Sequence, residues 1–225
     1  MQLVILCGGK ATRLYPRTYT IPKSMIEICG KPFIYWQLHN FKNAGITDVV
    51  LCTGFKAEQI KDYVKDGKEF GLNVHYSDDG DNFLGTGGAV KKALPLLKDY
   101  FYLTYGDSYL DLSCIGKLNQ YTMTIYKNDN QLEPSNIEFD NKIIKYDKKN
   151  LNERMKYIDY GISYLDKEAF TEEGVFDLSD TLKRLIADNK MNACIATKRF
   201  YEMGSEKGIK EMIVKLTEKE GLTGV

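Results

Sequence analysis

Short apolar runs alternate with amphipathic stretches along the first half of the chain. The runs have the length of buried strands and end at glycine or polar residues, whereas the stretches between them carry apolar residues at helical spacing. Strands are predicted at 3–6, 48–53, 72–76 and 100–105, and helices at 33–41, 58–64 and 88–97. Alternation of this kind predicts a mainly parallel sheet with helices on both faces.

The pattern changes after Asp111, where strand-like segments follow one another without helices between them. These segments lie at 123–126, 137–139, 142–146 and 157–165, and Asp140-Asn141 is a candidate hairpin turn. A helix at 177–188, a strand at 194–197 and a helix at 205–216, N-capped by Ser205, complete the prediction. Since neither an internal repeat nor a long linker is present, we predict one α/β domain over residues 1–225.

Charge and cysteine usage exclude several classes of protein. The 225 residues carry 31 Lys plus Arg and 31 Asp plus Glu, and this balance argues against binding of nucleic acid or an anionic membrane by the whole surface. No apolar run approaches the roughly 18 residues of a membrane span, and the start lacks a signal peptide pattern. Five scattered cysteines without a C-x-x-C pair suggest neither disulfides nor zinc. A reduced, cytoplasmic protein is therefore expected.

The segment Gly8-Gly9-Lys10-Ala11-Thr12-Arg13-Leu14 directly follows the first predicted strand. Small residues let backbone N–H groups approach phosphate oxygens, and arginine adds a forked, charge-assisted contact. The spacing matches neither the P-loop nor the Rossmann fingerprint, and alone it is equally compatible with a tight turn. Gly106-Asp107 also follows a predicted strand, so both segments point to one crevice at the carboxyl ends of the strands.

Further short motifs occur in a definite order along the chain. Each has an ordinary structural explanation by itself, such as an exposed lysine, a helix start or a strand-end aspartate. The motifs are Pro22-Lys23-Ser24-Met25, Gly30-Lys31-Pro32, Leu84-Gly85-Thr86-Gly87-Gly88-Ala89, Tyr105-Gly106-Asp107-Ser108, Tyr160-Gly161-Ile162 and Phe200-Tyr201-Glu202-Met203-Gly204-Ser205. Together with the Gly8-Gly9 loop, this order resembles the sugar-phosphate nucleotidyltransferases (NDP-sugar pyrophosphorylases) over roughly residues 1–210. The short form resembles the bacterial heptose and mannose 1-phosphate guanylyltransferases.

The resemblance implies a fold and an activity. The fold is a Rossmann-like, mainly parallel α/β sheet flanked by helices, with antiparallel sugar-binding excursions in the second half. The nucleotide-binding half then covers about 1–111, the sugar-binding half about 112–204, and the C-terminal helix and tail 205–225. The activity is transfer of a nucleoside monophosphate from an NTP to a sugar 1-phosphate, with release of pyrophosphate.

The resemblance also implies roles for particular residues. Catalytic roles fall to Arg13 and Lys23, and Mg²⁺ is expected to be held by Asp107 and Glu202. Nucleotide contacts are expected from the phosphate loop and the glycine-rich segment, at Leu6, Gly8, Gly9, Gly85, Thr86 and Gly87. Sugar-phosphate contacts are expected from Lys148 (or its neighbour Lys149), Asp159 and Gly161.

The chemistry explains why no histidine-based arrangement is needed. The attacking phosphate oxygen is already anionic, so the task is to bring two polyanions together, which suits cations and backbone dipoles. Three residues depart from the usual family pattern: Ala11 replaces a glycine, Glu202 a more common aspartate, and Asp159 an asparagine. The change at Asp159 suggests a sugar other than glucose.

Several alternatives stay open at this point. GTP with a heptose or hexose 1-phosphate is our preferred pair, and CTP, UTP or dTTP with a hexose 1-phosphate is the alternative. A non-catalytic regulator that binds nucleotide sugars is disfavoured because Arg13, Lys23 and Asp107 are all present. A glycosyltransferase is disfavoured because Asp107-Ser108-Tyr109 lacks the second aspartate of Asp-x-Asp. We expect no nucleic-acid or membrane partner, and a homodimer is possible.

Overall fold

Strand β1 (Gln2–Leu6) lies in the middle of the sheet and shows why the first apolar run is continuous. The computed structural model of the chain describes residues 1–80 and 82–221. Leu3 and Ile5 belong to one buried cluster and Val4 to another, on the opposite face. Because successive side chains of a strand point to opposite faces, helices on both sides of the sheet require apolar residues at every position.

The parallel part of the sheet has the strand order β5-β4-β1-β6. Its other strands are β4 (Asp48–Thr53), β5 (Asn73–Asp78) and β6 (Tyr100–Tyr105). Leu6 pairs with Cys52 on one side and with Tyr105 on the other, so three strands end at the same edge. This edge is where ligands bind in open α/β sheets.

Two pairs of helices cover the two faces. Helices α1 (Phe33–Asn43) and α2 (Ala57–Val64) pack on the Leu3 and Ile5 side, and α3 (Gly85–Ala93) and α4 (Leu178–Ala187) on the Val4 side. Among the helices within the described ranges, none is long and apolar enough to cross a membrane.

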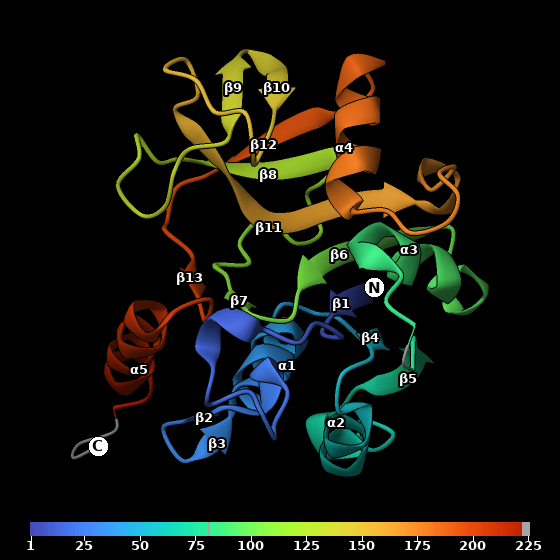
Figure 1. Cartoon of the computed structure of the whole chain (residues 1–225), viewed down its shortest axis with the longest axis vertical. Coiled ribbons are helices and arrows are strands. Elements are labelled where there is room, and N and C mark those ends of the chain that lie inside the picture. The colour runs from blue at the N-terminus through green and yellow to red at the C-terminus, as the bar shows by residue number, and fades with distance from the viewer. Residues whose placement is uncertain (81, 222–225) are drawn as a thin grey trace.

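The second half extends the same sheet with strands of mixed direction (Figure 1). Strand β11 (Tyr157–Asp166) runs antiparallel to β6 and pairs with β8 (Thr122–Lys127), which in turn pairs with β12 (Asn192–Ala196) in parallel. Strands β9 (Ile137–Asp140) and β10 (Lys142–Tyr146) form a hairpin in which Asn141 has a φ of 56°. The predicted α/β fold class is confirmed, with a sheet that is mixed as a whole.

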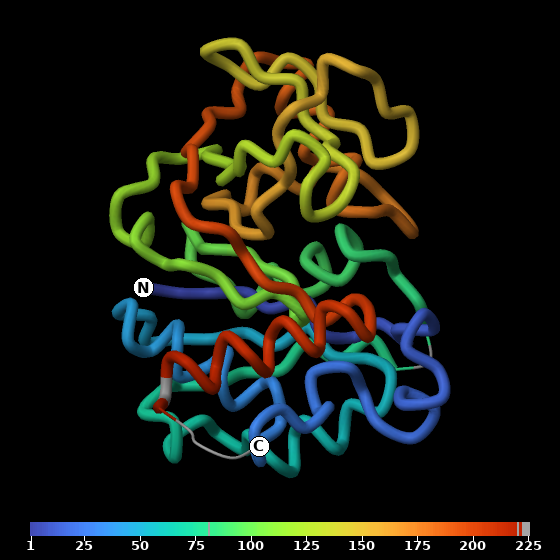
Figure 2. The backbone as a smooth tube through the Cα atoms, turned by 90° about the vertical axis from the view of Figure 1, so that its left-hand side faces the viewer, coloured from blue at the N-terminus to red at the C-terminus, as the bar shows by residue number. Residues whose placement is uncertain are grey.

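The last helix returns to the first half of the chain. Helix α5 (Glu206–Glu220) begins at Ser205, whose side chain accepts a hydrogen bond from the Gly208 N–H at 3.1 Å, as predicted. Figure 2 shows this helix running across the N-terminal half. It packs there in a third cluster that includes Ile28 of β2 (Glu27–Ile28), a short strand that pairs with β3 (Lys31–Pro32).

Two local expectations were wrong. The glycine-rich segment after Leu84 is not a loop, because α3 already begins at Gly85 rather than at residue 88. The helix ends at Ala93 and a 3₁₀ turn, Leu94–Leu96, follows it. Pro95 accounts for that ending, since proline has no N–H to continue the α-helical bonding and restricts the residue before it.

Candidate active site

Two cavities adjoin each other at the carboxyl edge of the parallel strands. The larger has a volume of about 560 Å³ and the smaller about 220 Å³. Four residues line both of them: Ala11, Lys23, Tyr105 and Asp107. Two ligands that occupied the cavities together would therefore meet at these side chains.

The smaller cavity is built from the start of the phosphate loop and the first turn of α3. Leu6, Gly8 and Gly9 line it on one side, and Gly85 and Thr86 on the other. All five were predicted as nucleotide contacts, and the topology brings them together because α3 packs on the face of the sheet beside β1.

Ala11 lies in the phosphate loop where the two cavities meet. Its φ of 50° lies in the left-handed region, which costs a non-glycine residue roughly 1–2 kcal/mol. The Thr18 hydroxyl, which is buried, donates to the Ala11 carbonyl at 2.9 Å and holds this conformation. Ala11 therefore carries strain that the usual family glycine would not. Arg13 follows it in the chain and lines the larger cavity.

Lys23 and Asp107 form an ion pair at the junction of the cavities. Lys23 Nζ lies 2.6 Å from Asp107 Oδ2, and the two side chains are 23% and 26% exposed. Pro22 precedes Lys23 and starts a 3₁₀ turn, Lys23–Met25, that fixes the lysine's backbone. The pair is accessible from the cavities and yet partly shielded from solvent.

Asp107 and Glu202 lie on neighbouring segments although 95 residues separate them in sequence. The two-residue strands β7 (Ser108–Tyr109) and β13 (Tyr201–Glu202) pair antiparallel, with Glu202 opposite Ser108. The Met203 N–H also donates to the Asp107 carbonyl at 2.9 Å. The pairing brings the two predicted metal ligands to one wall of the larger cavity.

The electrostatics of Glu202 fit a cation site. Desolvation by the cavity wall raises the pKa of Glu202, and the negative charges of Asp107 and Glu133 raise it further. Lys23 and Arg13 oppose this rise, so both cations face the same site. Across residues 1–80 and 82–221, no cluster of three or more His, Cys, Asp or Glu side chains could hold a metal. Two carboxylates nevertheless suit Mg²⁺, which takes its other ligands from water and substrate phosphates.

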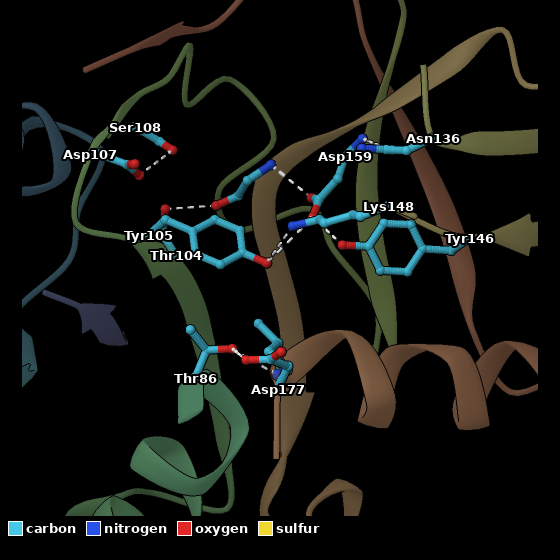
Figure 3. A network of polar contacts seen from close by, with 12 residues as sticks. Thr86, Thr104, Tyr105, Asp107, Ser108, Asn136, Tyr146, Lys148, Asp159 and Asp177 are labelled. Carbon is cyan, nitrogen blue, oxygen red and sulfur yellow. Dashed lines mark hydrogen bonds and ion pairs between the residues drawn. The ribbon is translucent and has the colours of Figure 1, made fainter. Parts of the chain in front are cut away.

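Lys148, rather than Lys149, lines the larger cavity. Its Nζ lies 3.4 Å from the Tyr105 hydroxyl, 3.6 Å from Asp159 Oδ2, and 4.9 Å from the centre of the Tyr105 ring (Figure 3). Desolvation, the largest influence, lowers the pKa of Lys148, but Tyr105, Asp159 and Asp107 together raise the pKa above its usual value. Lys148 is therefore a stable cation beside the shared wall.

Asp159 is engaged by protein donors at both oxygens. Its Oδ1 accepts from the Gly161 N–H at 2.9 Å, and its Oδ2 accepts from the hydroxyls of Tyr146 at 3.0 Å and Tyr105 at 3.4 Å. The side chain is only 6% exposed. These contacts favour a role in holding Lys148 over direct contact with a sugar, which stays a prediction for both Asp159 and Gly161.

Gly87 is the one predicted site residue that lines neither cavity. Its N–H donates to the Phe176 carbonyl at 3.0 Å, and a Cβ at this position would meet the Phe176 ring at 2.3 Å. The neighbouring Thr86 hydroxyl accepts from the Leu178 N–H at 2.8 Å, which joins α3 to the start of α4. Gly87 thus serves the packing of the two helices.

Several lining residues carried no signal in the sequence. They are Asp79, Phe83, Glu133 and Asn136. Tyr105 also lines both cavities, and it belongs to the motif Tyr105-Gly106-Asp107-Ser108, but no role was predicted for it. The others lie in loops or at strand ends without a motif of their own.

The comparisons with known proteins agree with this geometry. The family description "Nucleotidyl transferase" matches residues 2–207. The chain belongs to the nucleotidyl transferase family. It is 33% identical over 213 residues to the D-glycero-alpha-D-manno-heptose 1-phosphate guanylyltransferase of Campylobacter jejuni, an alignment that covers 91% of this chain and 95% of the relative. It is also 37% identical over 113 residues to the N-acetylmuramate alpha-1-phosphate uridylyltransferase of Neisseria meningitidis, an alignment that covers about half of each protein. The chain spans about half the length of the bifunctional protein GlmU of Methanococcus maripaludis, to which it is 34% identical over 205 residues.

Two solved structures share the fold. One is UDP-glucose pyrophosphorylase complexed with UDP-glucose, with a TM-score of 0.81 at 18% identity, covering 97% of this chain and 98% of that one. Another is HddC from Yersinia pseudotuberculosis complexed with GMP-PN, with a TM-score of 0.73 at 24% identity, covering 96% and 99%. The predicted family and enzyme class, a sugar-phosphate nucleotidyltransferase, are confirmed.

Proposed function

We propose that this nucleotidyltransferase joins GTP to a heptose or hexose 1-phosphate, giving a GDP-sugar and pyrophosphate. The observation that carries the proposal is the shared wall of the two cavities, where Lys23 and Asp107 face both. The smaller cavity takes the nucleotide and the larger takes the sugar phosphate. The α-phosphate of the nucleotide then lies at the junction.

The reaction forms one bond and breaks one bond at the α-phosphorus. An oxygen of the sugar phosphate attacks the α-phosphorus, and the bond to the bridging oxygen breaks, so pyrophosphate leaves with the electron pair. Lys23 and Arg13 stabilise the charge that spreads over the phosphate oxygens, and Lys148 binds the incoming phosphate. Asp107 and Glu202 would hold Mg²⁺, which supplies further positive charge at the transferred phosphate when bound.

Two similar proteins support the proposed substrates. The Campylobacter relative is a heptose 1-phosphate guanylyltransferase, and the Yersinia structure contains GMP-PN. Both support GTP, and the relative supports a heptose. CTP, UTP or dTTP with a hexose 1-phosphate is the alternative. A cytoplasmic location and a homodimer also stay predictions.

A matrix of substrates tests the proposal directly. The protein is incubated with Mg²⁺ and each of GTP, CTP, UTP, dTTP and ATP, crossed with mannose, glucose and heptose 1-phosphates. Mass spectrometry is expected to find a GDP-sugar in the heptose or mannose column. A nucleotide sugar with another base would keep the reaction and overturn GTP. An empty matrix from a protein that still binds nucleotide would favour a binding protein over an enzyme.

A pair of lysine variants separates the site from the surface. Lys23→Ala is expected to lower turnover about 100-fold or more, because it removes a cation from the reacting phosphate. Its melting temperature should stay close to that of the unmodified protein, since the side chain lines cavities. Lys31→Ala, an exposed lysine on β3, is the matched control with unchanged turnover. Normal turnover in Lys23→Ala would remove Lys23 from the site.

A further inference from the structure

Lys148 is held by long contacts at the wall of the larger cavity. Its Nζ lies 3.4 Å from the Tyr105 hydroxyl and 3.6 Å from Asp159 Oδ2, whereas an ordinary N–H···O hydrogen bond measures roughly 2.9–3.0 Å. The rings of Tyr105 and Tyr146 lie beside it, with their centres 4.9 and 5.7 Å from Nζ. The side chain is 44% exposed. The ammonium group has three N–H donors, so it can still donate to a ligand in the cavity.

The Asp159 carboxylate joins these neighbours to one another (Figure 3). Its Oδ2 is approached by the Tyr146 hydroxyl at 3.0 Å, the Tyr105 hydroxyl at 3.4 Å and Lys148 Nζ at 3.6 Å, so Tyr146 makes the shortest contact. Its Oδ1 accepts from the Gly161 N–H at 2.9 Å. Because the last torsion of an aspartate is broad, a contact at each oxygen is needed to fix the carboxylate. Gly161 and Tyr146 supply these two contacts.

Tyr146 lies in the protein interior and lines neither cavity. It ends β10, is 2% exposed, and belongs to the same apolar cluster as Ile143 and Leu182. Burial and the negative charge of Asp159 raise the pKa of Tyr146 well above its usual value, so the hydroxyl keeps its proton and can donate. A substrate in the cavities does not touch this side chain. Any effect of Tyr146 on binding must therefore pass through the side chains that it contacts.

The backbone around Lys148 is fixed separately from its side chain. Asp147 Oδ1 accepts from the N–H groups of Lys149 at 2.8 Å and Asn150 at 3.0 Å, which closes a turn that contains Lys148. Loss of the Tyr146 hydroxyl would leave this turn in place. It would act mainly on the direction of the Lys148 side chain.

We propose that Tyr146 is a positioning residue of the sugar-phosphate site, and that its hydroxyl orients Asp159 so that Asp159 holds Lys148 beside Tyr105. The inference rests on the proposed function, in which Lys148 binds the incoming phosphate. When Lys148 turns toward a phosphate, Asp159 keeps its contacts with Tyr146 and Gly161. The lysine can therefore engage the substrate without leaving a buried carboxylate unpaired, which would be costly.

Removing one hydroxyl group tests the role of Tyr146. The probes are the heptose, mannose and glucose 1-phosphates, and the one that the unmodified protein uses best is taken for the kinetics. Tyr146→Phe is expected to raise the KM for this sugar 1-phosphate roughly 3- to 10-fold, the cost of one hydrogen bond. The KM for GTP should not change, because neither Tyr146 nor Lys148 lines the smaller cavity.

Tyr102→Phe is the matched control. Tyr102 is 3% exposed, lines neither cavity, and its hydroxyl accepts a hydrogen bond from the Gly116 N–H at 2.8 Å. This variant also loses the hydroxyl of a buried tyrosine, so its melting temperature and kinetics report a purely structural loss. Its KM for the sugar 1-phosphate should equal that of the unmodified protein. A rise equal to that of Tyr146→Phe would overturn the assignment.

A double-mutant cycle shows whether Tyr146 acts through Lys148. If it does, adding Tyr146→Phe to Lys148→Ala should change the KM for the sugar 1-phosphate by less than about twofold. If the two effects multiply instead, Tyr146 acts by another route and does not position Lys148. An unchanged KM in the single variant Tyr146→Phe would also overturn the inference.

The outcomes separate this inference from the proposed function. If the unmodified protein makes a nucleotide sugar and Tyr146→Phe behaves like Tyr102→Phe, the role of Tyr146 is overturned and the reaction stands. If it makes no nucleotide sugar but binds one of the three sugar 1-phosphates in a calorimetric titration, the same variants are compared by Kd. A cycle in which Tyr146 has no effect without Lys148 then supports the positioning role although the proposed reaction fails. If none of the three binds, both fail.

Discussion

At the scale of single residues, the charges of the site converge on Asp107. Its carboxylate lies 2.6 Å from Lys23 Nζ, and the β7–β13 pairing holds Glu202 on the neighbouring segment. The charge of Asp107 raises the pKa of Glu202 even with Lys23 and Arg13 close by. Two carboxylates that repel each other in this way gain from a shared divalent cation.

Removing either carboxylate should weaken magnesium binding. Asp107→Asn and Glu202→Gln are each expected to raise the Mg²⁺ concentration for half-maximal activity roughly tenfold or more, because each removes one anionic ligand. Titrations of activity with MgCl₂ at saturating substrates measure this. Glu133→Gln is a useful comparison, since Glu133 lines the same cavity and acts on Glu202 only through its charge. An unchanged titration for Glu202→Gln would rule out a shared metal.

Neighbouring lysines offer a second test at this scale. Lys148→Ala should raise the KM for the sugar 1-phosphate about 10- to 100-fold, because a charge-assisted contact to phosphate is lost. Lys149→Ala should leave that KM unchanged, since Lys149 does not line the larger cavity. Steady-state kinetics with each substrate varied in turn distinguishes the two. An equal effect of both changes would indicate a general electrostatic role instead.

At the scale of elements, the glycine-rich segment at the start of α3 has two roles, one in the cavity and one in packing. Gly85 lines the smaller cavity, whereas Gly87 packs against Phe176 and donates its N–H to the Phe176 carbonyl. The first turn of α3 therefore serves the cavity on one side and the contact with the segment before α4 on the other.

Two adjacent glycines should respond differently to the same substitution. Gly87→Ala is expected to destabilise the protein by about 1–3 kcal/mol, since its Cβ would overlap the Phe176 ring at 2.3 Å. At Gly88 the nearest atom is Leu84 Cβ at 3.0 Å, and alanine also gains helix propensity, so Gly88→Ala should cost less. Urea unfolding curves of the two variants give the comparison. Equal stabilities would mean that α3 can shift away from Phe176.

The strand ends explain which site residues could be predicted from the sequence. Gly8, Gly9 and Asp107 were predictable because each follows an apolar run, which is a local signal. Glu202 was expected only through the resemblance, because β7 and β13 are two residues long and too short for any periodicity to reveal. Asp79 gave no signal in the sequence. Its buried Oδ1 has no hydrogen-bond donor among the described residues, and this depends on the three-dimensional packing.

At the scale of the whole molecule, the chain crosses between its halves more than once. The sheet carries strands of both halves, and after β12 the chain returns through β13 to α5 beside the first half (Figure 1). Met203, Ile209 and Met212 pack there against residues of the first half such as Ile28 and Phe33. The C-terminal segment thereby fixes Glu202 relative to Asp107 from outside the sheet.

The wall shared by the two cavities has a consequence for the pace of the catalytic cycle. In the proposed arrangement, each substrate fills one cavity and gives up its translational freedom separately on binding. A nucleotide sugar would then reach into both cavities as one molecule, so it would combine both sets of contacts and lose that freedom only once. The enzyme should accordingly retain its own product, and escape of the product rather than bond formation would then limit turnover until a later enzyme draws it away.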